Sequence, residues 1–298
     1  MKPVSDIKSR VMFALSMFIF GTIGILRKYI LLPSGIIAMA RGMIGLIFLL
    51  IVILIKKDKI SFKAIRKNLL LLCLSGISLG ANWMLLFEAY EYTRVSTATL
   101  CYYMAPVIIV LVSPAFFKEK LTVKKALCVA AACFGMTLVS GVMKNSTLGA
   151  NEAKGILLGL SAALFYACVV IMNKKIHDIS PYDKTMVQLA VSTTVLIPYT
   201  IITGEYKGIV FDGKTFILLI VAGVLHTGIA YMLYFGTISK LKSQTVALFS
   251  YIDPIIAILL SALFLKERIG LTEGFGAAII LSATAISELL PDKKRYQE

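Results

Sequence analysis

The pattern of hydrophobic and polar residues divides this chain into long apolar segments separated by short polar connections. Each segment is close to the roughly 20 residues that an α-helix needs to cross a lipid bilayer. The pattern predicts ten such helices, at approximately residues 11–31, 35–55, 69–90, 95–117, 125–143, 155–173, 183–203, 215–237, 243–265 and 270–290. The connections are too short to hold a soluble domain. The sequence therefore predicts an all-α integral membrane protein with ten transmembrane helices.

The first apolar segment differs from a secretory signal peptide. Its apolar stretch is longer than the hydrophobic region of a signal peptide, and no small-residue cleavage site follows it. We therefore expect residues 11–31 to remain in the mature protein as the first helix.

The apolar pattern repeats itself with an offset of 148 residues, without any insertion. The repeated residues of the fourth and ninth segments are Thr97, Leu100, Tyr103, Pro106, Leu111, Ser113, Phe116, Lys118 and Glu119, which recur as Thr245, Leu248, Tyr251, Pro254, Leu259, Ser261, Phe264, Lys266 and Glu267. Gly80, Met84, Leu85 and Phe87 recur as Gly228, Met232, Leu233 and Phe235, and Pro33 recurs as Pro181. A duplicated, hydrophobic chain is typical of secondary transporters, whose binding site lies between the two halves.

Each half contains five predicted helices, and an odd number forces the second half to cross the membrane in the opposite direction. The sequence thus predicts two inverted five-helix repeats, at 1–143 and 155–290, related by a pseudo-two-fold axis in the membrane plane. Residues 144–154 form a polar connection outside the membrane, and residues 291–298 a cytoplasmic tail.

Composition and charge agree with this interpretation. Hydrophobic residues make up 58% of the chain, against about 45–50% in soluble domains. The net charge of +15 could indicate nucleic-acid binding, but the Lys and Arg residues concentrate in the connections on one side of the predicted membrane. This bias follows the positive-inside rule and places both termini in the cytoplasm. A prokaryotic source would make the plasma membrane its location, and no nucleic-acid partner is expected.

Several motifs then point to a known family. The fourth helix runs from Tyr103-Met104-Ala105-Pro106 to Lys118-Glu119-Lys120, and the ninth from Tyr251-Ile252-Asp253-Pro254 to Lys266-Glu267-Arg268. Together with Phe20-Gly21 and with Pro33 followed by Arg41, these motifs resemble the EamA family of the drug/metabolite transporter superfamily. The chain departs from the commonest pattern at Phe20, where a Trp is frequent, and at Gln188, near the repeat counterpart of Arg41.

The resemblance implies a central cavity lined mainly by the first, third, fourth, sixth, eighth and ninth helices. The fifth and tenth helices would be peripheral, where they could support a homodimer. Members of the family move amino acids, drugs, quaternary amines and sugars. The resemblance therefore implies transport of a small molecule without naming the substrate.

Ionisable residues inside membrane helices are costly and are the first candidates for function. Asp253 lies near the middle of the ninth helix beside Pro254, and its repeat counterpart is Ala105. It could bind a cationic group of the substrate or carry a coupling proton. It could instead pair with a buried base or cap backbone N–H groups that the proline leaves free.

Three further ionisable residues are candidates with weaker support. Arg41 could anchor a substrate carboxylate or pair with Asp253, but a structural anchor near the interface is the preferred reading. Glu88, late in the third helix, could favour cations at the outer mouth or simply lie in interfacial water. His226, in the middle of the eighth helix, is more typical of an interhelical hydrogen bond than of a proton relay. The candidate proton carriers are therefore Asp253, Glu88 and His226.

Aromatic and small residues complete the predicted site. Trp83, Tyr102, Tyr103, Tyr231 and Tyr251 lie at membrane depth, and an aromatic cavity with a carboxylate suits an organic cation or an apolar amino acid. Ordinary helix packing is the alternative explanation. Asn82 could hydrogen-bond within this cavity or across helices. Pro106, Pro254, Gly80 and Gly228 are assigned structural roles, the glycines as points of close helix approach.

No motif for hydrolysis, nucleotide binding or metal binding occurs in the sequence. The five cysteines fall inside predicted helices without metal-ligand spacing, so no metal, cofactor or enzymatic activity is predicted. The preferred function is a secondary active transporter of an amino acid, organic cation or drug-like solute, working by alternating access and exporting its substrate. Proton coupling and exchange with a counter-substrate both remain open. The alternative is a membrane-embedded scaffold or a lipid-modifying enzyme.

Overall fold

A computed structural model describes residues 3–57, 60–117, 122–139, 149–209, 212–238, 241 and 249–289 of the chain, which form helices and connections without any strand. The helices are α1 (Pro3–Gly21), α2 (Ile23–Tyr29), α3 (Ser34–Lys56), α4 (Phe62–Lys67), α5 (Leu69–Tyr92), α6 (Val95–Tyr102), α7 (Ala105–Phe117), α8 (Val123–Val139), α9 (Ala150–Lys175), α10 (Pro181–Ile202), α11 (Gly213–Ile220), the π-helical η1 (Val221–Ile229), α12 (Ala230–Ile238), α14 (Ile252–Phe264) and α15 (Leu271–Leu289).

Much of this helical content is suited to a membrane. Within the described part of the chain, seven helices or runs of consecutive helices are long and apolar enough to cross a bilayer: Ile7–Tyr29, Ser34–Lys56, Leu69–Tyr92, Val95–Phe116, Ala150–Lys175, Pro181–Ile202 and Gly213–Tyr234. Two shorter apolar helices, Ile252–Phe264 and Leu271–Ser287, follow. The all-α class is confirmed, whereas the number of ten crossings stays a prediction. The segments predicted at 125–143, 243–265 and 270–290 lie partly outside the described residues.

Two of the described helices begin at least five residues earlier than the apolar pattern predicts: α1, which begins at Pro3 instead of residue 11, and α9. The sixth segment was expected to begin at residue 155, but α9 begins at Ala150. Its first turn is polar and contains Glu152, whose negative charge is favourable near a helix N-terminus. A hydropathy pattern detects only the apolar part of such a helix, so residues 150–154 were assigned to the connection.

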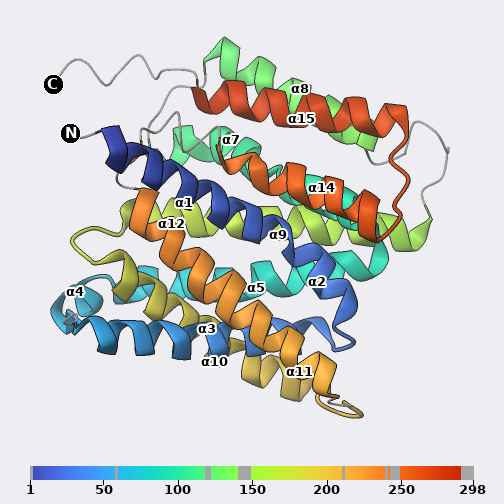
Figure 1. The fold of residues 1–298 in the computed structure, drawn as a ribbon. Coiled ribbons are helices and arrows are strands. Elements are labelled where there is room, and N and C mark those ends of the chain that lie inside the picture. The colour runs from blue at the N-terminus through green and yellow to red at the C-terminus, as the bar shows by residue number, and fades with distance from the viewer. Residues whose placement is uncertain are drawn as a thin grey trace, which may run out of the picture.

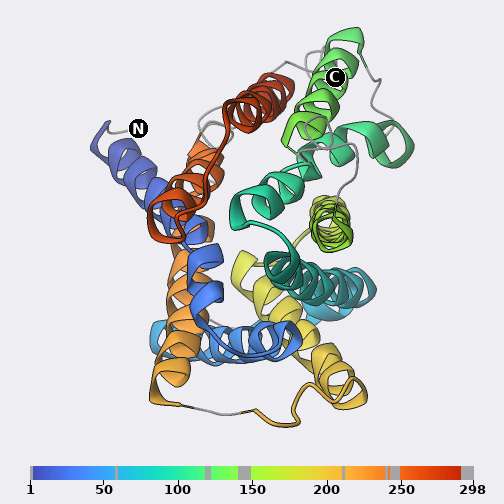
Figure 2. The same cartoon turned by 90° about the vertical axis from the view of Figure 1, so that its right-hand side faces the viewer.

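The long helices run roughly side by side, and Figure 2 looks along many of them. In that view α1, α12 and α14 form one wall, and α5, α6 and α9 form the opposite wall. The pair α3 and α10 joins the walls at one edge of the bundle, and the pair α8 and α15 lies at the other edge. Helix α1 begins and α15 ends at the same end of the bundle (Figure 1).

The contacts between helices follow the sequence repeat. The contact of α5 with α9 has its counterpart, after the offset of 148 residues, in that of α12 with α1. The contacts of α7 with α9 and of α10 with α5 correspond in the same way to those of α14 with α1 and of α3 with η1. Two further pairs, α3–α10 and α8–α15, join helices that are each other's repeat counterparts. Such an exchange of contacts is what a pseudo-two-fold axis produces.

Glycines allow the closest of these contacts. A Cβ atom on Gly80 would lie 3.2 Å from the backbone oxygen of Ser192 in α10, and one on Gly228 would lie 2.3 Å from the ring of Phe48 in α3. Both repeats thus use the duplicated glycine where a helix of one half packs on a helix of the other. Small residues at such crossings let helices approach without a hydrophobic driving force.

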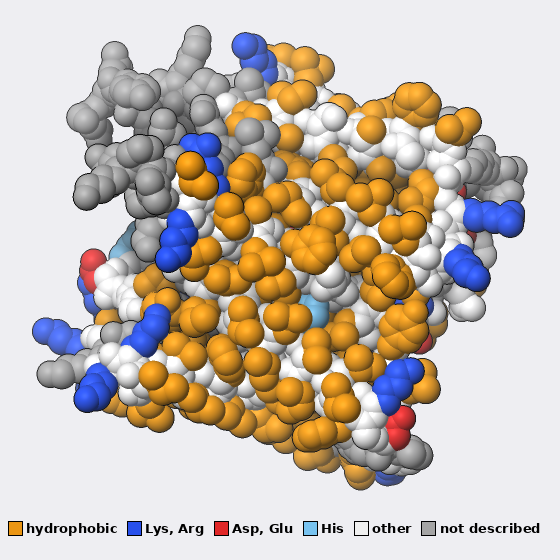
Figure 3. All heavy atoms as spheres, in the orientation of Figure 1, with side chains coloured by type: hydrophobic (Ala, Val, Ile, Leu, Met, Phe, Trp, Pro, Cys, Tyr) orange, Lys and Arg blue, Asp and Glu red, His pale blue; other side chains and the backbone are white. Residues whose placement is uncertain are grey.

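The surface has the polarity of a membrane protein. In Figure 3 hydrophobic side chains cover the middle of the visible face, and Lys and Arg side chains gather toward its two ends. The exposed apolar residues include Leu54, Leu70, Leu157, Ile202 and Leu263, each more than 60% exposed. A soluble protein rarely exposes so extensive an apolar surface, so this band is suited to contact with lipid.

Candidate functional site

The candidate site is built around a break in the helix of each repeat. Helix α6 ends at Tyr102 and α7 begins at Ala105, with Tyr103 and Met104 in the turn between them. In the second repeat the corresponding turn residue is Tyr251, and α14 begins at Ile252. Pro106 and Pro254 therefore fall in the first turn of the following helix, where a missing backbone N–H costs nothing. The duplicated Tyr and Pro thus place the break at equivalent positions.

Asp253 lies in the first turn of α14, directly after this break. Its carboxylate is within hydrogen-bonding reach of the Tyr103 hydroxyl, from the break in the other repeat. A helix N-terminus favours a negative charge at this position. Helix α1 passes so close that a Cβ atom on Gly21 would lie 2.6 Å from the Asp253 backbone oxygen. Asp253 is thus fixed between α1, the break in the first repeat and its own helix.

Aromatic rings from both repeats form pairs on the two walls of the bundle. The ring of Tyr102 lies 5.7 Å from that of Tyr103 and 5.4 Å from that of Tyr166 in α9. On the other wall, Phe20 of α1 lies 5.6 Å from Tyr231 of α12 in an edge-to-face arrangement. Such offset and edge-on ring pairs are favourable geometries. The predicted aromatic residues Tyr102, Tyr103 and Tyr231 therefore belong to the walls that face each other in Figure 2.

Arg41 lies against the aromatic residues of α5. Its side chain is buried, and the centre of its guanidinium lies 4.4 Å from the Trp83 ring and 5.7 Å from the Phe87 ring. Its Nε donates a hydrogen bond of 2.8 Å to the Thr227 hydroxyl. In the described part of the chain Arg41 forms no ion pair, so the Arg41–Asp253 bridge considered from the sequence is not present.

His226 is buried in η1 with a neighbour at each ring nitrogen. Its Nε2 lies 2.8 Å from the hydroxyl of Thr22, and its Nδ1 lies 3.3 Å from the carbonyl oxygen of Val221. The Thr22 contact links the break between α1 and α2 to the π-helical segment. This arrangement corresponds to the interhelical hydrogen bond that the sequence favoured, and it places His226 beside Arg41 through its neighbour Thr227.

The two remaining polar candidates lie in different surroundings. Asn82 is buried and donates a hydrogen bond of 2.7 Å to the carbonyl oxygen of Ala162 in α9, while its Oδ1 has no partner among the described residues. Glu88 lies in an acidic group near Arg27, with Glu91 and Glu205. The structure therefore does not bring Glu88 together with Asp253.

Sequence reasoning missed the carboxylates that tie the helix ends together. Glu267 accepts hydrogen bonds from the backbone N–H groups of Val95 and Ser96, at 2.7 and 3.1 Å, and from the Ser96 hydroxyl at 2.7 Å. It therefore caps α6 from the opposite repeat. Arg94 adds an ion pair of 2.9 Å with Glu273. The repeated Lys-Glu pair marked Glu267 in the sequence, but no local pattern identified its partner.

Glu205 has a similar role at the start of α3. It accepts a hydrogen bond of 3.2 Å from the backbone N–H of Ile36. Burial raises the pKa of the Glu205 carboxyl, the hydrogen bond from Ile36 lowers it, and the negative charge of Glu88 raises it. The net effect is a pKa above the usual value for glutamate.

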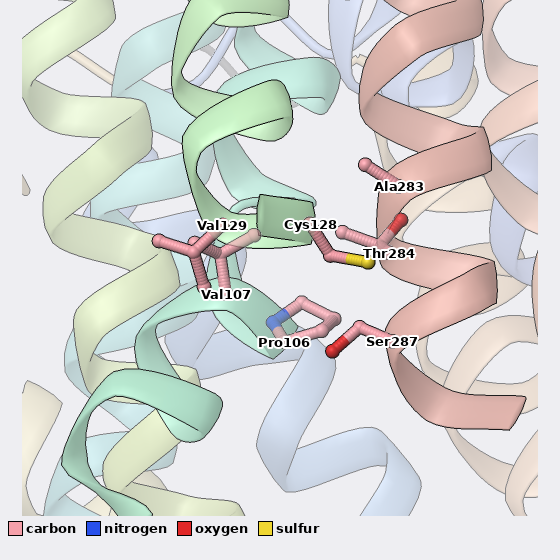
Figure 4. A pocket seen from close by; sticks show the side chains of 7 residues that line it. All are labelled: Pro106, Val107, Cys128, Val129, Ala283, Thr284 and Ser287. Carbon is pink, nitrogen blue, oxygen red and sulfur yellow. The ribbon is translucent and has the colours of Figure 1, made fainter. Parts of the chain in front are cut away.

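Two hollows lie between described helices, and neither is lined by Asp253, Arg41 or His226. Figure 4 shows the smaller, of about 10 Å³, enclosed by Pro106, Val107, Cys128, Val129, Ala283, Thr284 and Ser287. This volume would hold about one water molecule, so it is too small for a solute. The second is an apolar groove between α8 and α15, lined by residues such as Leu127, Phe275 and Ile286. Its exposed apolar lining suits contact with lipid.

Comparisons with known proteins agree on a family. The model of the EamA-like transporter family matches residues 8–141 and again residues 153–288. The chain is 30% identical over 277 residues to the uncharacterized transporter YxxF of Bacillus subtilis, covering 93% of this chain and 88% of that protein.

Two further matches are a more distant relative and a solved structure. A probable amino-acid metabolite efflux pump of Escherichia coli is 26% identical over 181 residues, covering 57% of this chain and 60% of the pump. A crystal structure that covers 94% of this chain and 97% of its own has a TM-score of 0.68 at 15% identity, which shows similarity of fold.

Proposed function

Because the chain belongs to the EamA-like transporter family and is a multi-pass membrane protein, we propose that it is a secondary active transporter that exports a small organic metabolite. Its relatives are transporters rather than enzymes, so membrane transport is its general function. The proposed substrates are amino acids, organic cations or drug-like solutes. The E. coli relative, named as a probable amino-acid metabolite efflux pump, supports the first class and the outward direction.

The observation that carries this proposal is the pair of helix breaks at Tyr103 and Tyr251, with Asp253 within reach of Tyr103. Broken helices in transporters expose backbone groups and polar side chains near mid-membrane, where substrates bind. Here the two breaks come from opposite repeats and meet through the α6–α14 contact. A rearrangement of one repeat against the other would therefore change the surroundings of Asp253.

In the proposed mechanism, the repeats 1–143 and 155–290 are inverted and cross the membrane ten times, with both termini in the cytoplasm. The pairwise exchange of helix contacts between the repeats supports this topology. Alternating access follows if the two repeats exchange conformations around the site. In a prokaryotic cell the protein would reside in the plasma membrane.

The site residues are assigned roles on this basis. Asp253 binds a cationic group of the substrate or carries a coupling proton, and Tyr103 orients its carboxylate. Tyr102, Tyr231, Tyr251 and Trp83 supply aromatic walls, and Asn82 a polar contact. His226 and Glu88 remain second candidates for proton coupling.

The test is transport by purified protein in proteoliposomes. Vesicles are loaded with an unlabelled amino acid, quaternary amine or cationic drug, and counterflow of the same labelled compound is measured. A transporter accumulates label transiently and saturably, whereas a scaffold or a lipid-modifying enzyme does not. We expect Asp253→Asn to abolish counterflow of cationic solutes or its dependence on pH.

Asp178→Asn is the matched control, because Asp178 is 74% exposed and, among the described residues, its ion pair is with Lys67 at one end of the bundle. It should leave counterflow unchanged. Saturable counterflow that Asp253→Asn does not alter would remove Asp253 from the mechanism. No counterflow of any tested solute would contradict the proposed transport of these classes.

A further inference from the structure

Arg41 presents a positive charge in the membrane interior without a described negative partner. The residue is 5% exposed and lies in α3, whose 23 residues are long enough to span a bilayer. A buried guanidinium has five N–H donors and retains its charge in proteins. One of these donors, at Nε, is used by Thr227, and no described residue accepts a hydrogen bond from the two terminal nitrogens. Such a charge is costly unless an anion meets it.

The surroundings hold the guanidinium in one orientation. Its central carbon lies 4.4 Å from the centre of the Trp83 ring, and its Nε donates a hydrogen bond to the Thr227 hydroxyl. Thr227 belongs to η1, and π-helical segments occur frequently at functional sites. The buried Thr193 hydroxyl also has no hydrogen-bond partner among the described residues, and it lies beside Gly42, the next residue to Arg41. The terminal nitrogens of Arg41 and the Thr193 hydroxyl are thus polar groups without a hydrogen-bond partner among the described residues.

We propose that Arg41, Thr227 and Trp83 form an anion subsite that binds a carboxylate of the transported solute. A planar guanidinium matches a carboxylate through two parallel hydrogen bonds, and its single charge is balanced by a single carboxylate. Trp83 holds the guanidinium in place by a cation–π contact. The inference rests on the proposed transport function, because it adds a property of the solute to it.

The position of the subsite relative to Asp253 supports this assignment. Tyr90 and Tyr102 each lie within range of electrostatic interaction with both Arg41 and Asp253. The two charged residues therefore border the same aromatic cluster while forming no ion pair with each other. A solute between them would find a positive group at one side and a carboxylate at the other, which suits a zwitterion.

The single tryptophan of the chain provides a direct probe, because Trp83 is the residue on which Arg41 is stacked. The full-length protein in detergent is titrated with L-leucine, with L-leucinamide, which lacks the carboxylate, and with 4-methylpentanoate, which lacks the amine. L-phenylalanine, its amide and 3-phenylpropanoate form a second series. Intrinsic tryptophan fluorescence is recorded for each titration.

We expect saturable changes in Trp83 emission with the carboxylate-bearing probes. The amides should bind at least about tenfold more weakly, because they lose the hydrogen bonds between the carboxylate and the charged guanidinium. In Arg41→Gln the acid and the amide should bind equally weakly, and Arg41→Lys should restore part of the preference. Arg27→Gln is the matched control: Arg27 is also buried but has Glu91, Ser34 and the Ile30 carbonyl as partners, so it should keep the preference.

Equal binding of acid and amide to the wild type would overturn the subsite without the need for any variant. An acid preference that persists in Arg41→Gln would also overturn it, as would the lack of a saturable response to every carboxylate. Counterflow by the wild type of a solute without a carboxylate, unaffected by Arg41→Gln, would reject the subsite and keep transport. Carboxylate binding at Trp83 without any counterflow would keep the subsite and reject transport.

Discussion

Replacing Glu267 by Gln tests whether one repeat holds the other through a helix cap. The Glu267 side chain lies at the end of the bundle where α14 leads into α15, and its two oxygens meet the first turn of α6. One oxygen accepts the bond from Val95, and the other accepts both bonds from Ser96. Gln has the same side-chain length but only one acceptor oxygen. Its NH₂ group faces the Val95 N–H in one orientation and both donors of Ser96 in the other.

The magnitude follows from these contacts. The more favourable orientation keeps the Gln oxygen on Ser96 and places the NH₂ group against the Val95 N–H. Losing the bond at Val95 costs about 1 kcal/mol, and losing the negative charge at the helix N-terminus adds about 0.3–1 kcal/mol. We therefore expect Glu267→Gln to lower the free energy of unfolding by about 1–2 kcal/mol. For a chain of this size, that corresponds to a decrease in melting temperature of roughly 3–8 °C.

Thermal unfolding of purified protein in detergent measures this change. Asp178→Asn is the control, because Asp178 is 74% exposed, its partner Lys67 is 66% exposed, and their ion pair should contribute about 0–1 kcal/mol. Equal, small shifts for the two variants would refute the reasoning, since the cap would then contribute no more than an exposed ion pair.

Three further changes test the helix contacts and the effect of pH. Gly135→Ala should lower the free energy of unfolding in detergent by about 1–3 kcal/mol, because its Cβ would lie 2.8 Å from the Gly276 carbonyl oxygen. An unchanged midpoint of unfolding would show that α8 and α15 can separate freely. Gly21→Ala should lower both the melting temperature and the counterflow rate, because its Cβ would displace the Asp253 backbone; normal transport would contradict that contact. The raised pKa of Glu205 means that the folded protein binds the proton more tightly than the unfolded chain, so stability should decrease as pH rises from the ordinary glutamate pKa to the raised value. Glu205→Gln should flatten this part of a pH–stability curve, and an unchanged slope would assign it to another group.

The helices and the site were predictable to different degrees, for physical reasons. A helix that faces lipid must be apolar over most of its length, so hydropathy alone located the long helices. The breaks at Tyr103 and Tyr251 fall in segments that were predicted as continuous helices. The signal for each break is the proline three residues later, which is favoured near a helix start. The polar first turn of α9 was missed because helix formation there depends on local charge and propensity rather than on burial.

The surroundings of Arg41 could not be read from the sequence. Its depth along α3 suggested an interfacial anchor, but its direction depends on how α3 packs on η1 and α5. The π-helical course of Val221–Ile229 sets where Thr227 points, and no residue pattern marks it. The cap by Glu267 likewise joins residues that are far apart in the sequence. The sequence therefore located the charged residues, whereas tertiary packing decided their partners.

The contacts between repeat counterparts have a consequence for how such a chain can be assembled. In α8 and α15, the pairing of Gly135 with Gly276 has an equivalent in Cys128 and Ala283, which face the same small cavity in Figure 4. Each helix of this pair thus contributes the same two positions to the contact. Two copies of a single ancestral half-chain, inserted in opposite directions, could have met through this surface before gene fusion joined them. The two halves produced today as separate polypeptides should accordingly reassociate in one membrane.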